Sequence, residues 1–104
     1  MNQRQVDSVP RYVISIAAEI LNMQAYTLRY YEKIGIVEPY RSRGNIRLYS
    51  DRDIELIRRI KSLVEDMGIN LAGVEVILRL TQRINQLQDD LEEKNRRLKK
   101  IRGE

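Results

Sequence analysis

Apolar residues recur every three or four positions along much of this 104-residue chain, a spacing that predicts helices with one buried face. The first apolar stripe is expected to be buried on a helix that Ser15 caps. Its members are Ile16, Ala17, Ile20 and Leu21. Asn22 follows the stripe. Because Asn tolerates the left-handed conformation in which helices often end, residues 22–25 are predicted to form a tight turn.

A second short helix is expected after this turn, from residue 24 or 25 to residue 34. Leu28 and Tyr31 face inward in this prediction, and Gly35 ends the helix. Two helices of two to three turns that are joined by three or four residues make a helix-turn-helix.

Two short extended segments follow, at residues 40–42 and 46–49, and they flank Gly44 and Asn45. A Gly-Asn pair between two extended segments is typical of the tip of a β-hairpin. A hairpin directly behind a helix-turn-helix predicts a winged helix-turn-helix, in which the hairpin is the wing.

A longer helix is predicted to begin at Ser50, because Asp53 three residues later completes a pattern similar to a capping box. The apolar positions that keep helical spacing up to Gly68 are Ile54, Ile57, Ile60, Leu63, Val64 and Met67. Asn70 is a candidate cap for a further helix. The apolar positions of that helix are Leu71, Val74, Ile77 and Leu78.

In the last part of the chain, the apolar stripe narrows to the seam that is typical of a coiled coil. A final helix is predicted over roughly residues 82–102. Its apolar positions alternate by three and four residues, and Lys94 interrupts them. A helix with so narrow a stripe must pack either on its own domain or against a second copy, and the length of the seam favours a homodimer. The predicted dimerisation residues are Ile77, Leu80, Ile84, Leu87, Leu91, Leu98 and Ile101.

The composition removes several classes of function. The chain has no Cys and no His, which excludes structural zinc, thiolate nucleophiles, disulfides and imidazole bases. Carboxylate pairs such as Asp89 and Asp90 lie among Arg and Lys, as is typical of solvated helix faces. We therefore predict no enzymatic activity, no metal and no cofactor. The sequence shows neither a membrane span nor a signal peptide, which predicts a soluble cytoplasmic protein.

The location of the positive charge is more informative than the net charge of +4. Residues 40–49 contain Arg41, Arg43 and Arg47 and no acidic residue, with a tyrosine at each end. The guanidinium fork matches two phosphate oxygens and keeps its charge, so these arginines are predicted to bind DNA. Tyr49, at the end of the same segment, is also predicted to bind DNA. The alternative is a surface hairpin that its charges keep soluble.

A second group of candidate DNA-binding residues crowds the start and the outer face of the second helix. Its members are Gln24, Tyr26, Thr27, Arg29 and Tyr30. Arg can be bidentate to guanine and Gln to adenine, while Tyr and Thr hydroxyls can contact phosphates. The alternative is an ordinary solvated helix face. Together with the wing, the group predicts a double-stranded DNA partner.

Over roughly residues 12–80, the sequence closely resembles the MerR family of transcription regulators. The residues that carry the resemblance are TLRYYEKIGIV at 27–37, Pro39, Arg41, RLYSDRDI at 47–54 and GINL at 68–71. The resemblance implies a mainly α fold, with a winged helix-turn-helix and a long C-terminal helix that dimerises as an antiparallel coiled coil. The expected organisation is a flexible arm at 1–11, a DNA-binding domain at 12–80 and a coiled-coil dimerisation helix at 81–104.

The resemblance also implies roles for residues of the second helix. It places Tyr26 and Arg29 in the major groove, and Thr27 and Tyr30 at the DNA backbone. A glycine that is frequent in the family's helix-turn-helix turn is replaced here by Asn22, which the left-handed conformation still accommodates.

In the wing, the resemblance places Arg41 and Arg47 on phosphates, with Tyr49 supporting them. The family commonly has Asn-Gly-Tyr-Arg at the wing tip, whereas residues 44–47 are Gly-Asn-Ile-Arg. The turn chemistry survives this change, but the contact of the tyrosine is lost at Ile46.

Within the family, GINLAGV at residues 68–74, with Ile77 and Leu78, resembles the heat-shock repressor (HspR) branch. That branch implies repression of chaperone operons at inverted repeats, with the DnaK chaperone as co-repressor, at the nucleoid of a bacterial cytoplasm. Repressors of the GlnR type share a similar stretch, and the Thr-Leu-Arg of residues 27–29 favours HspR. An activator that unwinds its promoter and a coiled-coil adaptor that binds a protein are the two further functions compatible with the sequence.

Overall fold

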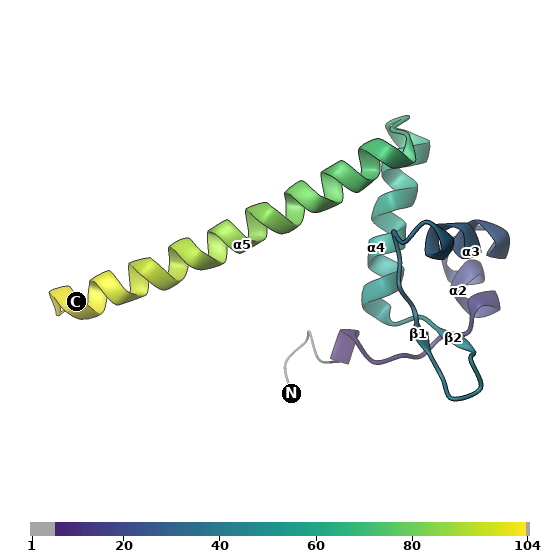
Figure 1. Cartoon of the computed structure of the whole chain (residues 1–104), viewed down its shortest axis with the longest axis horizontal. Coiled ribbons are helices and arrows are strands. Elements are labelled where there is room, and N and C mark those ends of the chain that lie inside the picture. The colour runs from purple at the N-terminus through teal and green to yellow at the C-terminus, as the bar shows by residue number, and fades with distance from the viewer. Residues whose placement is uncertain (1–5, 104) are drawn as a thin grey trace. The chain divides into compact units, whose positions relative to one another are not determined.

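The structure is a computed structural model that describes residues 6–103, and it is mainly helical with a small two-stranded sheet (Figure 1). The chain divides into two compact units, the first ending at Gly68 and the second beginning at Ile69. The predicted fold, a winged helix-turn-helix followed by a long helix, is confirmed. The elements are α2 (Ile14–Leu21), α3 (Ala25–Lys33), β1 (Tyr40–Arg41), β2 (Arg47–Leu48), α4 (Asp51–Lys61), a π-helical turn (Ser62–Asp66) and α5 (Leu71–Arg102).

Helix α2 begins at Ile14 without a side-chain cap. The backbone of Val13 is extended, and its carbonyl accepts hydrogen bonds from the amides of Ile16 (3.1 Å) and Ala17 (3.0 Å). Ser15 therefore lies inside the helix, and the prediction that it caps the helix is wrong.

The buried face of α2 also differs from the predicted stripe. Ile16 and Ile20 are 43% and 41% exposed, so the prediction is wrong for these two residues. Successive residues of a helix are rotated by about 100°, and Ile16 and Ile20 lie on the side that faces away from the core. The buried residues are Ala17, Ala18 and Leu21.

The turn between α2 and α3 forms as predicted. Asn22 adopts the left-handed conformation, with φ 53° and ψ 51°, and ends α2. The ammonium group of Lys61, from α4, donates hydrogen bonds to the carbonyl oxygens of Leu21 (2.9 Å) and Asn22 (3.3 Å). A cation at this end of a helix also interacts favourably with the helix dipole. The turn is thus fixed both by its own sequence and by a residue 39 positions away.

Helix α3 buries Leu28 and Tyr31, as predicted. Burial raises the pKa of the Tyr31 hydroxyl, and the charge of Glu65 adds to the effect. Gly35 follows the helix with a φ of 80°, a conformation that favours glycine.

The predicted hairpin is also present. Strands β1 and β2 are antiparallel and pair Tyr40 with Leu48 and Arg41 with Arg47. At the tip, the Ser42 carbonyl accepts a hydrogen bond from the amide of Asn45, which has a φ of 62°. The wing is therefore a closed hairpin with a left-handed residue at its tip.

The end of the predicted N-terminal arm is attached to the domain, whereas residues 1–5 lie outside the described part of the chain. The backbones of Tyr12 and Tyr49 exchange hydrogen bonds of 2.9 and 2.7 Å. Asp51 accepts one hydrogen bond from the Tyr12 hydroxyl (2.7 Å) and one from Arg11 (2.8 Å). The hydrogen bond with Tyr12 lowers the pKa of Asp51 and raises that of Tyr12.

Helix α4 begins with the predicted capping box, in which Ser50 and Asp53 each accept from the backbone amide of the other. Its buried residues are Ile54, Ile57 and Ile60. After Lys61 the helix widens into the π-helical turn, and the amide of Met67 reaches the Ser62 carbonyl five residues back. This wider turn changes the phase of the helical pattern. Consequently, the last three positions of the predicted stripe are not buried, and Met67 is 66% exposed.

Helix α5 runs without interruption for 32 residues, about 48 Å at ~1.5 Å per residue. The predicted cap is confirmed, because the Asn70 side chain accepts from the Gly73 amide at 2.8 Å. A Cβ at Gly73 would lie 2.8 Å from a methyl carbon of Ile69, so a larger residue would not fit without movement. The separate final helix predicted from residue 82 is wrong, since residue 82 lies within α5.

Candidate nucleic-acid interface

Helix α3 presents polar and aromatic side chains on the face opposite its buried residues. Tyr26 and Tyr30 are 69% and 50% exposed, and Gln24 and Arg29 are also exposed. Thr27 is half-buried. The structure therefore brings four of the five candidate residues of this helix to the surface, within about two turns.

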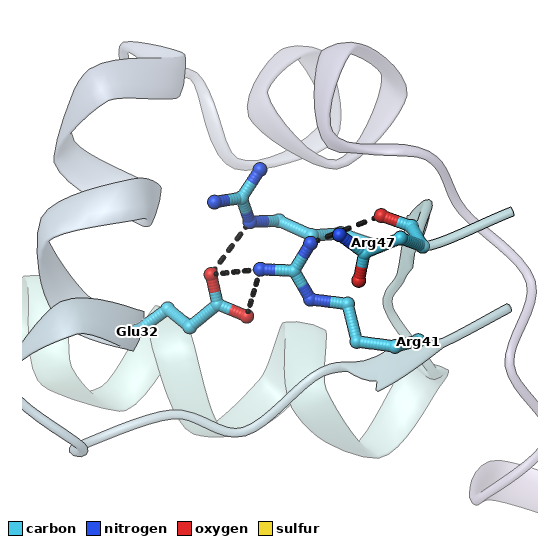
Figure 2. Close-up of polar contacts among 4 residues, drawn as sticks. Glu32, Arg41 and Arg47 are labelled. Atoms are coloured by element: carbon cyan, nitrogen blue, oxygen red, sulfur yellow. Dashed lines mark hydrogen bonds and ion pairs between the residues drawn. The ribbon is translucent and has the colours of Figure 1, made fainter.

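The wing is tied to α3 by Glu32, a carboxylate that was not among the candidate residues predicted from sequence (Figure 2). Both oxygens of Glu32 accept hydrogen bonds from one terminal nitrogen of Arg41, at 2.9 and 3.0 Å. The Nε of Arg47 donates to the same carboxylate at 2.6 Å. The Arg41 guanidinium also donates to the carbonyl of Asn45 at the wing tip, at 3.1 Å. We call Glu32, Arg41 and Arg47 the Glu32 cluster.

The two arginines of the Glu32 cluster are used differently. Arg41 directs both terminal nitrogens to protein acceptors. Within residues 6–103, Arg47 donates only through Nε, and its two terminal nitrogens point away from Glu32 (Figure 2). Arg43, the third arginine of the wing, is exposed and has no ion pair with any residue from 6 to 103. The donors still available to a ligand therefore belong mainly to Arg43 and Arg47.

Glu32 was missed because it is on the helix and not in the wing. Its side chain is only 19% exposed, so this carboxylate is partly withdrawn from water and needs partners. The available signal was a single acid at the end of α3, nine and fifteen residues before two arginines whose own segment has no acid. Charge-assisted hydrogen bonds to a partly buried carboxylate are stronger than an ion pair on the exposed surface.

Tyr49 lies in the core, and this corrects its prediction as a DNA-binding residue. Its side chain is fully buried, so it cannot reach nucleic acid from this position. The hydroxyl has no hydrogen-bond partner among the described residues. Burial raises the pKa of this hydroxyl, and the nearby charge of Glu32 raises it further. Tyr49 stabilises the end of the wing through its packing in the core and its backbone pairing with Tyr12.

Residues 12–81 match the family described as "MerR HTH family regulatory protein", which is more than half of the chain. The chain belongs to the MerR family. Members of this family are DNA-binding transcription regulators and not enzymes, so the exposed face of α3 and the wing belong to a DNA-binding domain. Among residues 6–103, no cluster of acidic side chains could hold a metal ion, and no helix is long and apolar enough to span a membrane.

Solved structures show the same MerR fold. One is HiNmlR, "a MerR family regulator lacking the sensor domain, bound to promoter DNA", with a TM-score of 0.62 and 21% identity. The alignment covers 88% of this chain and 75% of HiNmlR. A MerR-family transcriptional regulator from Bacillus cereus gives a TM-score of 0.61 and 23% identity, over 86% and 73% of the two chains.

Two curated relatives correspond to the two branches weighed from sequence. A putative heat shock protein HspR of Streptomyces coelicolor is 45% identical over 82 residues, which is 79% of this chain and 54% of the relative. The regulator GlnR of Bacillus anthracis is 38% identical over 71 residues, or 68% of this chain and 54% of the relative. The chain therefore spans about half the length of the curated relatives it matches.

Proposed function

We propose that this MerR-family regulator is a homodimeric repressor that places α3 in the major groove of an inverted-repeat operator. The observation that carries this proposal is the exposed row on α3 next to a wing that the Glu32 cluster holds to the same helix. Tyr26 and Arg29 would contact bases, and Gln24, Thr27 and Tyr30 would contact bases or backbone. A wing fixed to the recognition helix presents both contacts in one rigid arrangement, which lowers the entropy lost on binding.

The Glu32 cluster suggests separate roles for the wing arginines. Arg47 is oriented through Nε and offers its two terminal nitrogens to a phosphate, and Arg43 is available at the tip. Both terminal nitrogens of Arg41 donate hydrogen bonds to Glu32 and Asn45, so we assign Arg41 to positioning the wing. Thus Arg41, which sequence resemblance places on a phosphate, would act mainly through the protein.

Salt dependence of DNA binding separates these roles. Replacing Arg47 by Gln should lower the slope of log affinity against log salt concentration by about two for a dimer, since each lost phosphate contact removes ~0.9. Replacing Arg41 by Gln should weaken binding but change the slope by less than about one. Fluorescence anisotropy on a bound DNA fragment over a series of salt concentrations measures both. Equal losses of slope in the two variants would contradict the assignment.

The homodimer is proposed from the surface of α5. The seam residues beyond Ile77 are 47–82% exposed, so the described chain does not cover them. Such a stripe is stable in water only when another surface buries it, and a second α5 is the complementary partner. These residues are Leu80, Ile84, Leu87, Leu91, Leu98 and Ile101.

Within the MerR family, we propose a role in the heat-shock response. It is supported by the identity to the HspR relative, which exceeds that to GlnR over a longer alignment. In this proposal the protein represses chaperone operons at the nucleoid of a bacterial cytoplasm, with DnaK as co-repressor. The competing functions are a GlnR-like repressor, a promoter-unwinding activator and a protein-binding adaptor.

Selection of genomic fragments by the purified protein, with and without DnaK, tests the proposed role. We expect fragments upstream of chaperone operons to be enriched, and the enrichment to increase when DnaK is present. Enrichment of other operons would overturn the heat-shock role and leave DNA binding intact. An absence of any fragment preference would support the adaptor. Binding between the −35 and −10 elements would support the activator.

A further inference from the structure

The wing has three arginines and no acid, yet two of the three arginines are paired with Glu32 from α3. Glu32 accepts hydrogen bonds from Arg41 at 2.9 and 3.0 Å and from Arg47 at 2.6 Å. The side chain of Arg41 is 37% exposed, whereas that of Glu32 is 19% exposed. A ligand can therefore reach Arg41, but the protein already supplies an anion to it.

A carboxylate and a phosphate compete for the same nitrogens of a guanidinium. One terminal nitrogen of Arg41 donates to both oxygens of Glu32, and the other donates to the Asn45 carbonyl at 3.1 Å. Arg41 must therefore break these hydrogen bonds before its terminal nitrogens can bind DNA. Arg47 differs, because its terminal nitrogens have no hydrogen-bond partner among residues 6–103 and only Nε is fixed (Figure 2).

The charges of the Glu32 cluster act close to the fully buried Tyr49. Burial raises the pKa of the Tyr49 hydroxyl, and the charge of Glu32 raises it further, whereas the charges of Arg47 and Arg41 lower it. Charges that act on a buried group are screened less by water and salt than exposed charges. A passing phosphate therefore does not readily displace Glu32 from its arginines.

We infer that Glu32 determines specificity without touching DNA, because it withholds Arg41 from phosphates and restrains Arg47. DNA that lacks an operator (random DNA) is bound almost entirely through phosphates, so its affinity depends on the number of available cations. An operator adds base contacts from α3, and a preformed wing reduces the entropy lost in that complex. Glu32 thus weakens binding to random DNA more than binding to the operator. This inference rests on the proposed function, in which α3 reads the bases.

Glu32→Gln tests the inference by removing the charge while keeping the size of the side chain. Affinity for random DNA should rise roughly tenfold, because each subunit of the dimer gains Arg41 as a phosphate contact. Affinity for the operator should change less than about threefold, since the wing is then less well ordered. Competition binding with operator and random DNA at one salt concentration measures the ratio of the two affinities, which should fall.

Glu38→Gln is the matched control for this substitution. Glu38 is an exposed acid just before the wing, and it has no ion pair with any residue from 6 to 103. Its removal changes the net charge by the same amount, so the ratio of operator to random affinity should stay at the wild-type value. Equal ratios in the two variants would overturn the inference. A wild type without any preference for the operator would overturn the proposed function instead.

A second substitution tests whether Arg41 is the cation that Glu32 withholds. Arg41→Gln alone should lower the affinity for random DNA by less than about threefold, because Arg41 is already paired. In the Glu32→Gln background, the same substitution should lower this affinity roughly tenfold, because Arg41 is then a phosphate contact. Equal losses in the two backgrounds would show that Glu32 does not withhold Arg41, and would overturn the inference.

Side-chain NMR of the wild-type protein tests the inference without a substitution that could loosen the wing. Addition of random DNA should shift the guanidinium signals of Arg43 and Arg47. The signals of Arg41 should stay close to their positions in the free protein, because its terminal nitrogens remain on Glu32 and Asn45. A shift of the Arg41 signals as large as that of Arg43 would overturn the inference.

Discussion

An Arg29→Ala variant should lose roughly 30-fold to 10⁴-fold in affinity for its operator, while its affinity for random DNA falls far less. A bidentate contact from Arg to guanine contributes about 1–3 kcal/mol of discrimination, and a dimer loses two such contacts. Arg29 is exposed on α3, on the face opposite the buried Leu28 and Tyr31. The variant should therefore fold normally and lose specificity. Competition binding with operator and random DNA at one salt concentration measures the ratio.

Lys33→Ala is the matched control for this experiment. Lys33 is an exposed cation at the end of the same helix, so its removal changes the net charge by the same amount. We expect Lys33→Ala to keep the ratio of operator to random affinity close to that of the wild type. If Arg29→Ala and Lys33→Ala lowered affinity for both DNAs equally, Arg29 would be a general electrostatic contact and not a base contact.

The second large effect is expected from Leu87→Lys in the seam of α5. A buried lysine opposite an apolar partner disrupts the dimer, because the charge is desolvated without a counter-ion. A monomer then binds one half-site and loses the avidity of two linked sites, which is about 10²-fold to 10⁴-fold. Sedimentation should show a monomer, and operator affinity should fall by at least about 100-fold.

Gln82→Lys serves as the control for Leu87→Lys. It adds the same charge to an exposed position of α5 that lies outside the seam. This variant should remain dimeric and bind the operator about as tightly as the wild type. A Leu87→Lys protein that stays dimeric would show that the seam is not the dimer interface. Equal losses of operator affinity in both variants would indicate that the added charge, and not its position in the seam, weakens binding.

The parts of the fold that the sequence predicted correctly depend on local signals. The left-handed Asn22, the capping box of Ser50 and Asp53, and the Asn70 cap are each decided within about four residues. The tip of the hairpin at Asn45 is equally local. Short-range backbone and capping chemistry thus placed the helices and the wing without knowledge of the packing.

Several of the parts that were mistaken or missed depend on contacts between distant segments. Ile16 and Ile20 are apolar and correctly spaced, but the packing of α2 directs Ala17 and Leu21 inward instead. Tyr49 resembles a surface aromatic at the end of an arginine-rich strand, yet its neighbours bury it completely.

Glu32 illustrates the same point for the candidate site. The wing segment itself contains no acidic residue, but the partner of two of its arginines comes from α3. The ion pairs of Glu32 with Arg41 and Arg47 could not be deduced from the spacing of these residues along the sequence. On the basis of these contacts, the proposed function assigns Arg41 to positioning the wing.

In the proposed function, two copies of α3, linked by paired α5 helices, occupy two major grooves on one face of the DNA. A hydroxyl-radical footprint on an operator selected from genomic fragments tests this directly. We expect two protected regions related by a two-fold axis, on one face of the duplex and separated by a whole number of helical turns. A single protected region bound by a dimer, or two regions on opposite faces, would contradict the claim.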